Sequence, residues 1–296
     1  MTLDYVPYLI GGFVFVLGAA VGSFLSVCVH RLPKDESIVS PARSYCPACK
    51  TPLGVPDLVP LASFLALRAR CRHCGARITW RYFALELVTG LLFLGAFLAR
   101  GGILMSAAHL VELGADLVFI AILVAAFFID LETMLIPDEL TVTGICVGLA
   151  VDFAAIIFWG KNLSRLTDPA TQWTLSIPAS IVGLIVGGAI FVGMELFSEF
   201  VFKKEGMGGG DMKLAAAMGS RFGAGPLLIA VAMSVLMGAF VGIVLIVGRR
   251  RRRKDYIPFG PFLAAAGLAM ILWQGPIIQW AGHALEAYKQ AAFPAG

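Results

Sequence analysis

The sequence is poor in charged residues. Only 14% of its 296 residues are Asp, Glu, Lys or Arg, whereas 59% are hydrophobic and the mean hydropathy is +0.86. Soluble domains carry nearer a quarter charged residues, so this shortage excludes a large soluble domain. No internal repeat or low-complexity tract is evident. No positively charged segment precedes the first apolar run, which is therefore expected to be a retained helix and not a signal peptide.

Long apolar runs occupy almost the whole chain instead. A helix of roughly 20 apolar residues crosses the ~30 Å hydrocarbon core of a bilayer, and runs of about this length recur. They predict an all-α polytopic membrane helix bundle with about eight transmembrane spans. The weakest span is 212–223, which is short and contains Arg221. The spans are expected near 8–29, 81–99, 114–130, 139–159, 177–201, 212–223, 226–248 and 258–280.

The basic residues are concentrated in three connections. These are the long loop 31–81, the segment that holds Lys203, Lys204 and Lys213, and the run 249–254. Lys and Arg in short loops mark the cytoplasmic side of a membrane protein. This distribution places the connections 130–139 and 203–211 on the cytoplasmic face, and it predicts contacts with membrane lipids.

Four of the six cysteines form two CxxC pairs in the long basic loop. The pairs are Cys46 with Cys49 and Cys71 with Cys74, and 21 residues (50–70) separate them. Two such pairs supply four thiolates to one tetrahedral zinc ion. With no open coordination position, the predicted zinc is structural and fastens a loop that has little apolar surface. Unliganded reduced thiols are the alternative.

Asp130 lies at the end of an apolar run, in the segment Phe128-Ile129-Asp130-Leu131-Glu132. An ionisable side chain at this depth is expensive to bury and is a functional candidate by default. The alternative is that Asp130 only ends its helix at the membrane interface.

Asp211 follows a glycine-rich stretch, Gly206-Met207-Gly208-Gly209-Gly210. Glycine permits backbone conformations closed to other residues and lets another backbone approach, which suits an extended substrate beside an acid. A plain helix cap and a phosphate-binding turn are the alternatives, although the turn lacks a Walker pattern.

Together the two aspartates predict a reaction. They come from separate helices on one membrane face, and aspartyl proteolysis needs one ionised and one protonated carboxyl group. One acts as a base on water and the other as an acid toward the peptide, without a covalent intermediate. The pair therefore indicates Asp130 and Asp211 as catalytic.

The chain as a whole resembles the type IV prepilin peptidase family. The likeness rests on Gly22-Ser23-Phe24-Leu25-Ser26-Val27 leading to His30-Arg31-Leu32-Pro33, the paired CxxC loop, Arg81-Tyr82 with Glu86, the element from Asp130 to Pro137-Asp138, and the stretch ending in Gly208-Gly209-Gly210-Asp211. This last stretch is similar to the family's GxGD signature. The resemblance implies a transmembrane helix at 1–30, a cytoplasmic zinc-binding loop at 31–80 and a membrane-embedded aspartic peptidase domain at 81–296.

The resemblance also implies an activity. Family members cut the leader from prepilins or pseudopilins at the cytoplasmic face of the bacterial inner membrane, for type IV pili or type II secretion. Many then methylate the new amino terminus with S-adenosylmethionine. On this basis Asp130 and Asp211 are catalytic, and Gly206 and Gly208, Gly209 and Gly210 form a hinge beside the substrate. Asp138 is expected to be a helix cap, and no nucleic-acid partner is expected.

Methyl transfer is associated with the loop and with Arg81, Tyr82 and Glu86. The chain departs from the family pattern here, at Leu58-Val59 before Pro60, at Ala69 and at Phe83. A peptidase that only cleaves therefore stays open.

Two readings from other classes also remain. A transporter would bind ions at Asp130 and Asp211, because acids beside broken helices also mark transport sites. A scaffold of a secretion machine would use the zinc loop for docking.

Overall fold

The computed structural model describes residues 5–38, 44–46, 48–102, 106–160, 164–167, 174–202, 209–248 and 257–292. Apart from one short β-hairpin, the regular structure in these ranges is helical, which confirms the predicted helical membrane fold. The chain divides into two compact units, Met1–Leu140 and Thr141–Gly296. This division by packing is separate from the three-part organisation expected from the sequence, which stays a prediction.

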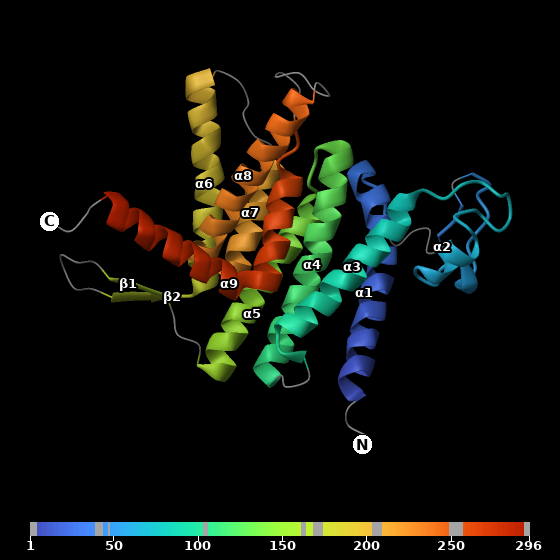
Figure 1. Cartoon of the computed structure of the whole chain (residues 1–296), viewed down its shortest axis with the longest axis horizontal. Coiled ribbons are helices and arrows are strands. Elements are labelled where there is room, and N and C mark those ends of the chain that lie inside the picture. The colour runs from blue at the N-terminus through green and yellow to red at the C-terminus, as the bar shows by residue number, and fades with distance from the viewer. Residues whose placement is uncertain are drawn as a thin grey trace. The chain divides into compact units, whose positions relative to one another are not determined.

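The first unit contains three long helices and a small cysteine loop, and Figure 1 labels most of these elements. The second unit contains most of a further long helix, a hairpin and four more helices. The elements of the first unit are α1 (Val6–Arg31), η1 (Leu32–Lys34), η2 (Val55–Asp57), α2 (Ala62–Ala66), α3 (Trp80–Ala99) and α4 (Ala107–Thr133). Those that follow are α5 (Asp138–Trp159), β1 (Ser164–Thr167), β2 (Thr174–Ile177), α6 (Ala179–Phe202), α7 (Gly209–Phe222), α8 (Ala224–Val247) and α9 (Gly260–Ala292).

Each predicted span corresponds to a helix, but the count of eight spans is not confirmed. Within the described residues, six helices are long and apolar enough to cross a membrane: α1, α3, α4, α5, α8 and α9. Helix α7 has 14 residues and is about 21 Å long, short of the ~30 Å hydrocarbon core. In α6 only the part Ala179–Met194 qualifies, as a shorter apolar helix.

Small residues let α1 and α3 approach closely in the first unit. A Cβ atom at Gly22 would lie 2.6 Å from the carbonyl oxygen of Leu85, and one at Gly18 would lie 2.7 Å from Cβ of Phe93. Lipid offers no hydrophobic driving force for helix association, so close van der Waals packing of this kind holds such helices together. The contact fixes the start of α3, which carries Arg81 and Glu86.

Glycine contacts also surround α7 in the second unit. A Cβ atom at Gly187 of α6 would lie 2.6 Å from the carbonyl oxygen of Ala215, and one at Gly183 would collide with the carbonyl oxygen of Gly219. On its other side, Gly148 of α5 leaves room for Ser220. The short helix that begins at Asp211 is therefore held between its neighbours by backbone-to-backbone contact.

The described residues between α5 and α6 form an antiparallel hairpin that pairs Ser164 with Ile177 and Thr167 with Thr174. The helix α9 is kinked, since Pro276 lies inside it and Trp273 has a non-helical φ of −132°. Proline removes a backbone donor and is the usual cause of such a kink.

The glycine contacts of α6 give a testable prediction. Gly183→Ala should lower the free energy of unfolding of the detergent-solubilised protein by about 1–3 kcal/mol, and with it the melting temperature, because the new methyl group overlaps the α7 backbone. Gly188→Ala on the same helix meets no atom within 4 Å and should leave stability unchanged or slightly raised. Equal melting temperatures for the two variants would contradict this packing.

Candidate functional site

Asp130 lies in the last turn of α4, where it is only 5% exposed. The helix is apolar along its length, and Leu123, Ala126 and Ile129 in its final turns are fully buried. It ends at Met134, which adopts a left-handed φ of 56° and donates its N–H to the carbonyl oxygen of Asp130 at 2.9 Å. Asp130 therefore lies at the end of an apolar helix, shortly before the connection 134–137 to α5.

Asp211 is the third residue of α7 and is 6% exposed. The N-terminal turn of a helix favours a negative charge, because its backbone N–H groups have no partner within the helix. Beyond it, Leu214, Ala215, Ala217 and Met218 are fully buried. Asp211 therefore lies at the start of its helix, whereas Asp130 lies at the end of its helix.

The predicted hinge glycines fall in two groups. Gly206 and Gly208 lie outside the described residues, whereas Gly209 and Gly210 are the first two residues of α7. A Cβ atom at Gly209 would meet no atom within 4 Å. Packing against the described part of the chain therefore does not require glycine at this position.

The structure brings the four predicted metal ligands together. The Sγ atoms of Cys46, Cys49, Cys71 and Cys74 all lie within 4.8 Å of one another, and Cys46 and Cys74 are 3.9 Å apart. Four thiolates around zinc at 2.3 Å stand about 3.8 Å from one another. The cluster thus has the dimensions of a tetrahedral metal site.

Both cysteine pairs sit on turns of the same design. In the first, Lys50 donates its N–H to the carbonyl oxygen of Cys46 at 2.8 Å. In the second, Gly75 donates to the carbonyl oxygen of Cys71 at 2.9 Å. Lys50 and Gly75 both have a positive φ, 57° and 71°, which bends the chain back over the thiols. Glycine adopts this conformation without strain, and lysine does so rarely.

At two of the four cysteines, hydrogen bonds favour the thiolate, which is the form that binds metal. The bond between the side chains of Cys49 and Thr51, at 3.2 Å, lowers the pKa of Cys49 to about 6. Backbone N–H groups of Cys74 and His73 lower the pKa of Cys71. The depressed pKa of Cys49 keeps that thiol largely ionised at neutral pH. At Cys74, a bond with the backbone of Ala76 lowers the pKa, but burial and the neighbouring thiols outweigh it and raise the pKa to about 11.

The residues associated with methyl transfer take part in contacts within the first unit. Glu86 is buried, and its Oε2 accepts the N–H of Leu61 at 2.7 Å, so it ties the cysteine loop to α3. Arg81 forms an ion pair with Glu132 of α4, and its guanidinium lies 5.6 Å from the ring of Tyr82. These contacts organise the start of α3.

Two further buried acids escaped the sequence reasoning. Asp116 of α4 is paired with Arg100 at 2.7 Å, and Asp152 of α5 accepts the N–H of Ser180, at the start of α6, at 2.9 Å. Both lie within apolar runs. The general rule that acids within membrane spans have a function could therefore have identified them from the sequence. Both contacts stabilise helix ends.

The apolar helices and the separate four-thiol loop define a multi-pass membrane protein with a cysteine cluster outside its spans. The family comparisons identify the class of enzyme. Residues 16–100 match the bacterial peptidase A24 N-terminal domain, and residues 117–243 match the type IV leader peptidase family. The chain belongs to the type IV leader peptidase family, which confirms the resemblance, and Asp130 and Asp211 both fall in the second match.

Several curated relatives carry the name prepilin leader peptidase/N-methyltransferase. One from Aeromonas hydrophila is 35% identical and the alignment covers 93% of this chain and 94% of the relative. One from Bacillus subtilis is 32% identical, with 90% and 95% covered. One from Myxococcus xanthus is 38% identical, with 81% and 64% covered. No solved structure shows a significant match.

The cysteine cluster leads to a prediction about metal content. Full-length protein purified in detergent should carry about one zinc ion per chain, and Cys71→Ser should lose most of it because a tetrahedral site needs all four ligands. Metal content is measured by mass spectrometry. Cys146→Ser is the matched control, since Cys146 is exposed on α5 and outside the cluster. A wild type without zinc, or equal loss in the control, would contradict the assignment.

Proposed function

We propose that this chain cleaves the leader peptide of type IV prepilins or pseudopilins by two-aspartate hydrolysis, with Asp130 and Asp211 as the catalytic acids. It then methylates the amino terminus that cleavage exposes. The observation that carries the proposal is the burial of both acids at helix ends, at 5% and 6% exposure, within the region that matches the leader peptidase family.

Burial supplies the chemistry that this reaction needs. A buried carboxyl group resists ionisation, because desolvation disfavours its charged form. Hydrolysis by two acids requires one group to stay protonated while the other takes a proton from water. The ionised carboxylate activates water for attack on the scissile carbonyl, and the protonated one gives its proton to the leaving amine. Water attacks directly, so no covalent intermediate forms.

The substrate must lie extended beside the acids. The space beside Gly209, two residues before Asp211, is free of other described residues within 4 Å and supports a substrate path there. We propose that Gly206, Gly208, Gly209 and Gly210 form this path, since glycine lets a foreign backbone come near.

The names of the relatives include a second activity, N-methyl transfer. We propose that the chain uses S-adenosylmethionine as methyl donor for it, and that the cysteine loop with a structural zinc is part of this activity. Arg81, Tyr82 and Glu86 would serve it by holding the loop on α3, as the bond from Leu61 to Glu86 does.

The basic loop gives the orientation. Arg68, Arg70, Arg72 and Arg77 are exposed in the loop that precedes α3. Positive loops stay on the cytoplasmic side, so we propose a multi-pass protein of the bacterial inner membrane whose active site faces the cytoplasm. Family membership does not favour the transporter or scaffold readings.

The catalytic assignment predicts loss of cleavage in two conservative variants. In detergent or membranes, the wild type should cut a prepilin with a Gly-Phe junction. Asp130→Asn and Asp211→Asn should each reduce the rate by at least about 10³-fold, because an amide neither takes up nor gives a proton. Cleavage is followed by gel shift or mass spectrometry of the product, at equal amounts of folded protein.

Asp138→Asn is the control. Asp138 is exposed, is the first residue of α5 and lies outside the proposed dyad. The control variant should cut at close to the wild-type rate. Near-normal cleavage by either dyad variant would remove that aspartate from the mechanism.

Methyl transfer should require cleavage only because cleavage produces the amino terminus that is methylated. With labelled S-adenosylmethionine, Asp211→Asn should put no label on intact prepilin, because the acceptor amine is absent. When the pilin has been cut beforehand, the same variant should label it at the wild-type rate. Failure of the wild type to label pre-cut pilin would show a peptidase that only cleaves.

A further inference from the structure

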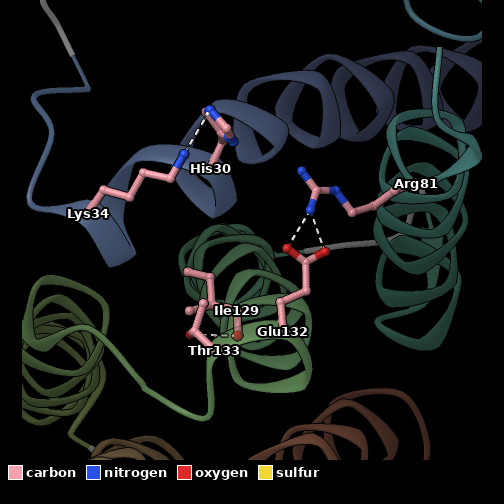
Figure 2. A network of polar contacts seen from close by, with 6 residues as sticks. All are labelled: His30, Lys34, Arg81, Ile129, Glu132 and Thr133. Atoms are coloured by element: carbon pink, nitrogen blue, oxygen red, sulfur yellow. Dashed lines mark hydrogen bonds and ion pairs between the residues drawn. The ribbon is translucent and has the colours of Figure 1, made fainter. Parts of the chain in front are cut away.

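An ion pair joins the start of α3 to the end of α4 in the first unit. Arg81 is the second residue of α3, and Glu132 is the last residue but one of α4. Nη1 of Arg81 donates to both carboxylate oxygens of Glu132, and Figure 2 shows the two side chains pointing toward each other. Glu132 lies two residues after Asp130, so the contact is made on the turn that carries the proposed catalytic acid.

The arginine of this pair is more buried than the glutamate. The side chain of Arg81 is 21% exposed and that of Glu132 is 40% exposed. Nε of Arg81 is buried without a hydrogen-bond partner among the described residues. The guanidinium is thus anchored at its Nη1 end by Glu132, with the ring of Tyr82 nearby.

The neighbouring cations have other partners. Nζ of Lys34 lies 3.2 Å from Nε2 of His30, and Figure 2 shows these two side chains turned toward each other. Nη1 of Arg31 donates to the carbonyl oxygen of Ser37 at 2.9 Å. Arg81 is therefore the cation that the structure assigns to Glu132.

The geometry of the last turn transmits this contact to Asp130. Successive residues of an α-helix are about 100° apart, so Glu132 and Asp130 leave the axis in nearly opposite directions. Oγ1 of Thr133 donates to the carbonyl oxygen of Ile129, and the N–H of Met134 to that of Asp130, both at 2.9 Å. The turn is closed as a unit, and fixing Glu132 fixes the rotation of Asp130 about the helix axis.

We propose that Arg81 and Glu132 are positioning residues, which hold the end of α4 so that the Asp130 carboxyl group keeps its working orientation. The inference rests on the proposed function and adds two residues to it. It also gives Arg81 a role in peptide cleavage, whereas the sequence associates it with methyl transfer.

The same two helices supply a matched control at their other ends. Arg100, which caps the end of α3, contacts Asp116 at 2.7 Å and Glu112 at 3.6 Å, both on α4. Glu112 and Glu132 are thus two partly exposed carboxylates on one helix, each paired with an arginine of α3. Glu132 lies close to Asp130 along the helix, whereas Glu112 lies far from it.

The experiment measures kcat and KM for cleavage of a prepilin by the full chain. Glu132→Gln should lower kcat by about 10- to 100-fold with KM within about twofold, as expected for a misplaced reacting group. Glu112→Gln should match the wild type in both constants. The charge swap Arg81→Glu with Glu132→Arg should recover most of the kcat that either single reversal loses. Melting temperatures confirm that each variant is folded.

The outcomes separate this inference from the proposed function. A wild type that does not cut overturns both. If the wild type cuts, a Glu132→Gln enzyme that matches Glu112→Gln overturns the inference alone. A rise in KM at constant kcat would also overturn the inference, because it would place Glu132 on the substrate. A charge swap that recovers no activity, while both single reversals are folded, would overturn it as well.

Discussion

The structure depends on the absence of water from the hydrocarbon core of a membrane. A backbone polar group without a partner is so unfavourable there that a chain crosses as a helix, with its hydrogen bonds made internally. Polar chemistry is then confined to helix ends. Asp130 lies in the last turn of α4 and Asp211 in the first turn of α7. Burial at these ends gives the acids a desolvated setting.

The cysteine loop lies outside the apolar helices that could span a membrane. Polar groups make several of the contacts that hold it together. The four thiols gather within 4.8 Å, Glu86 holds the N–H of Leu61, and Arg72 binds Asp57 at 2.7 Å, which lowers the pKa of that carboxyl group. These contacts attach the loop to α3, and through Arg81 and Glu132 the same helix reaches the end of α4. The region matched to the N-terminal family domain is thereby joined to the helix that carries Asp130.

Much of this was predictable from the sequence, because apolar runs and CxxC spacing are local signals. Helix positions and the cysteine cluster followed from them. The count of eight spans is not confirmed, since six helices among the described residues are long and apolar enough to cross. Hydropathy also does not reveal how α6 and α7 pack through Gly183 and Gly219. Pairing of charges was also beyond reach. Arg81 and Glu132 are 51 residues apart in the sequence, and only the folded helices bring them together.

The most direct test of the account is the double variant Asp130→Asn with Asp211→Asn, compared with each single variant. Residual cleavage is followed over long incubations with excess enzyme. Groups that act as one catalytic unit show losses that do not multiply. The account predicts that the double variant is no slower than the slower single variant. A loss equal to the product of the two single losses would show independent roles and contradict a shared two-acid mechanism.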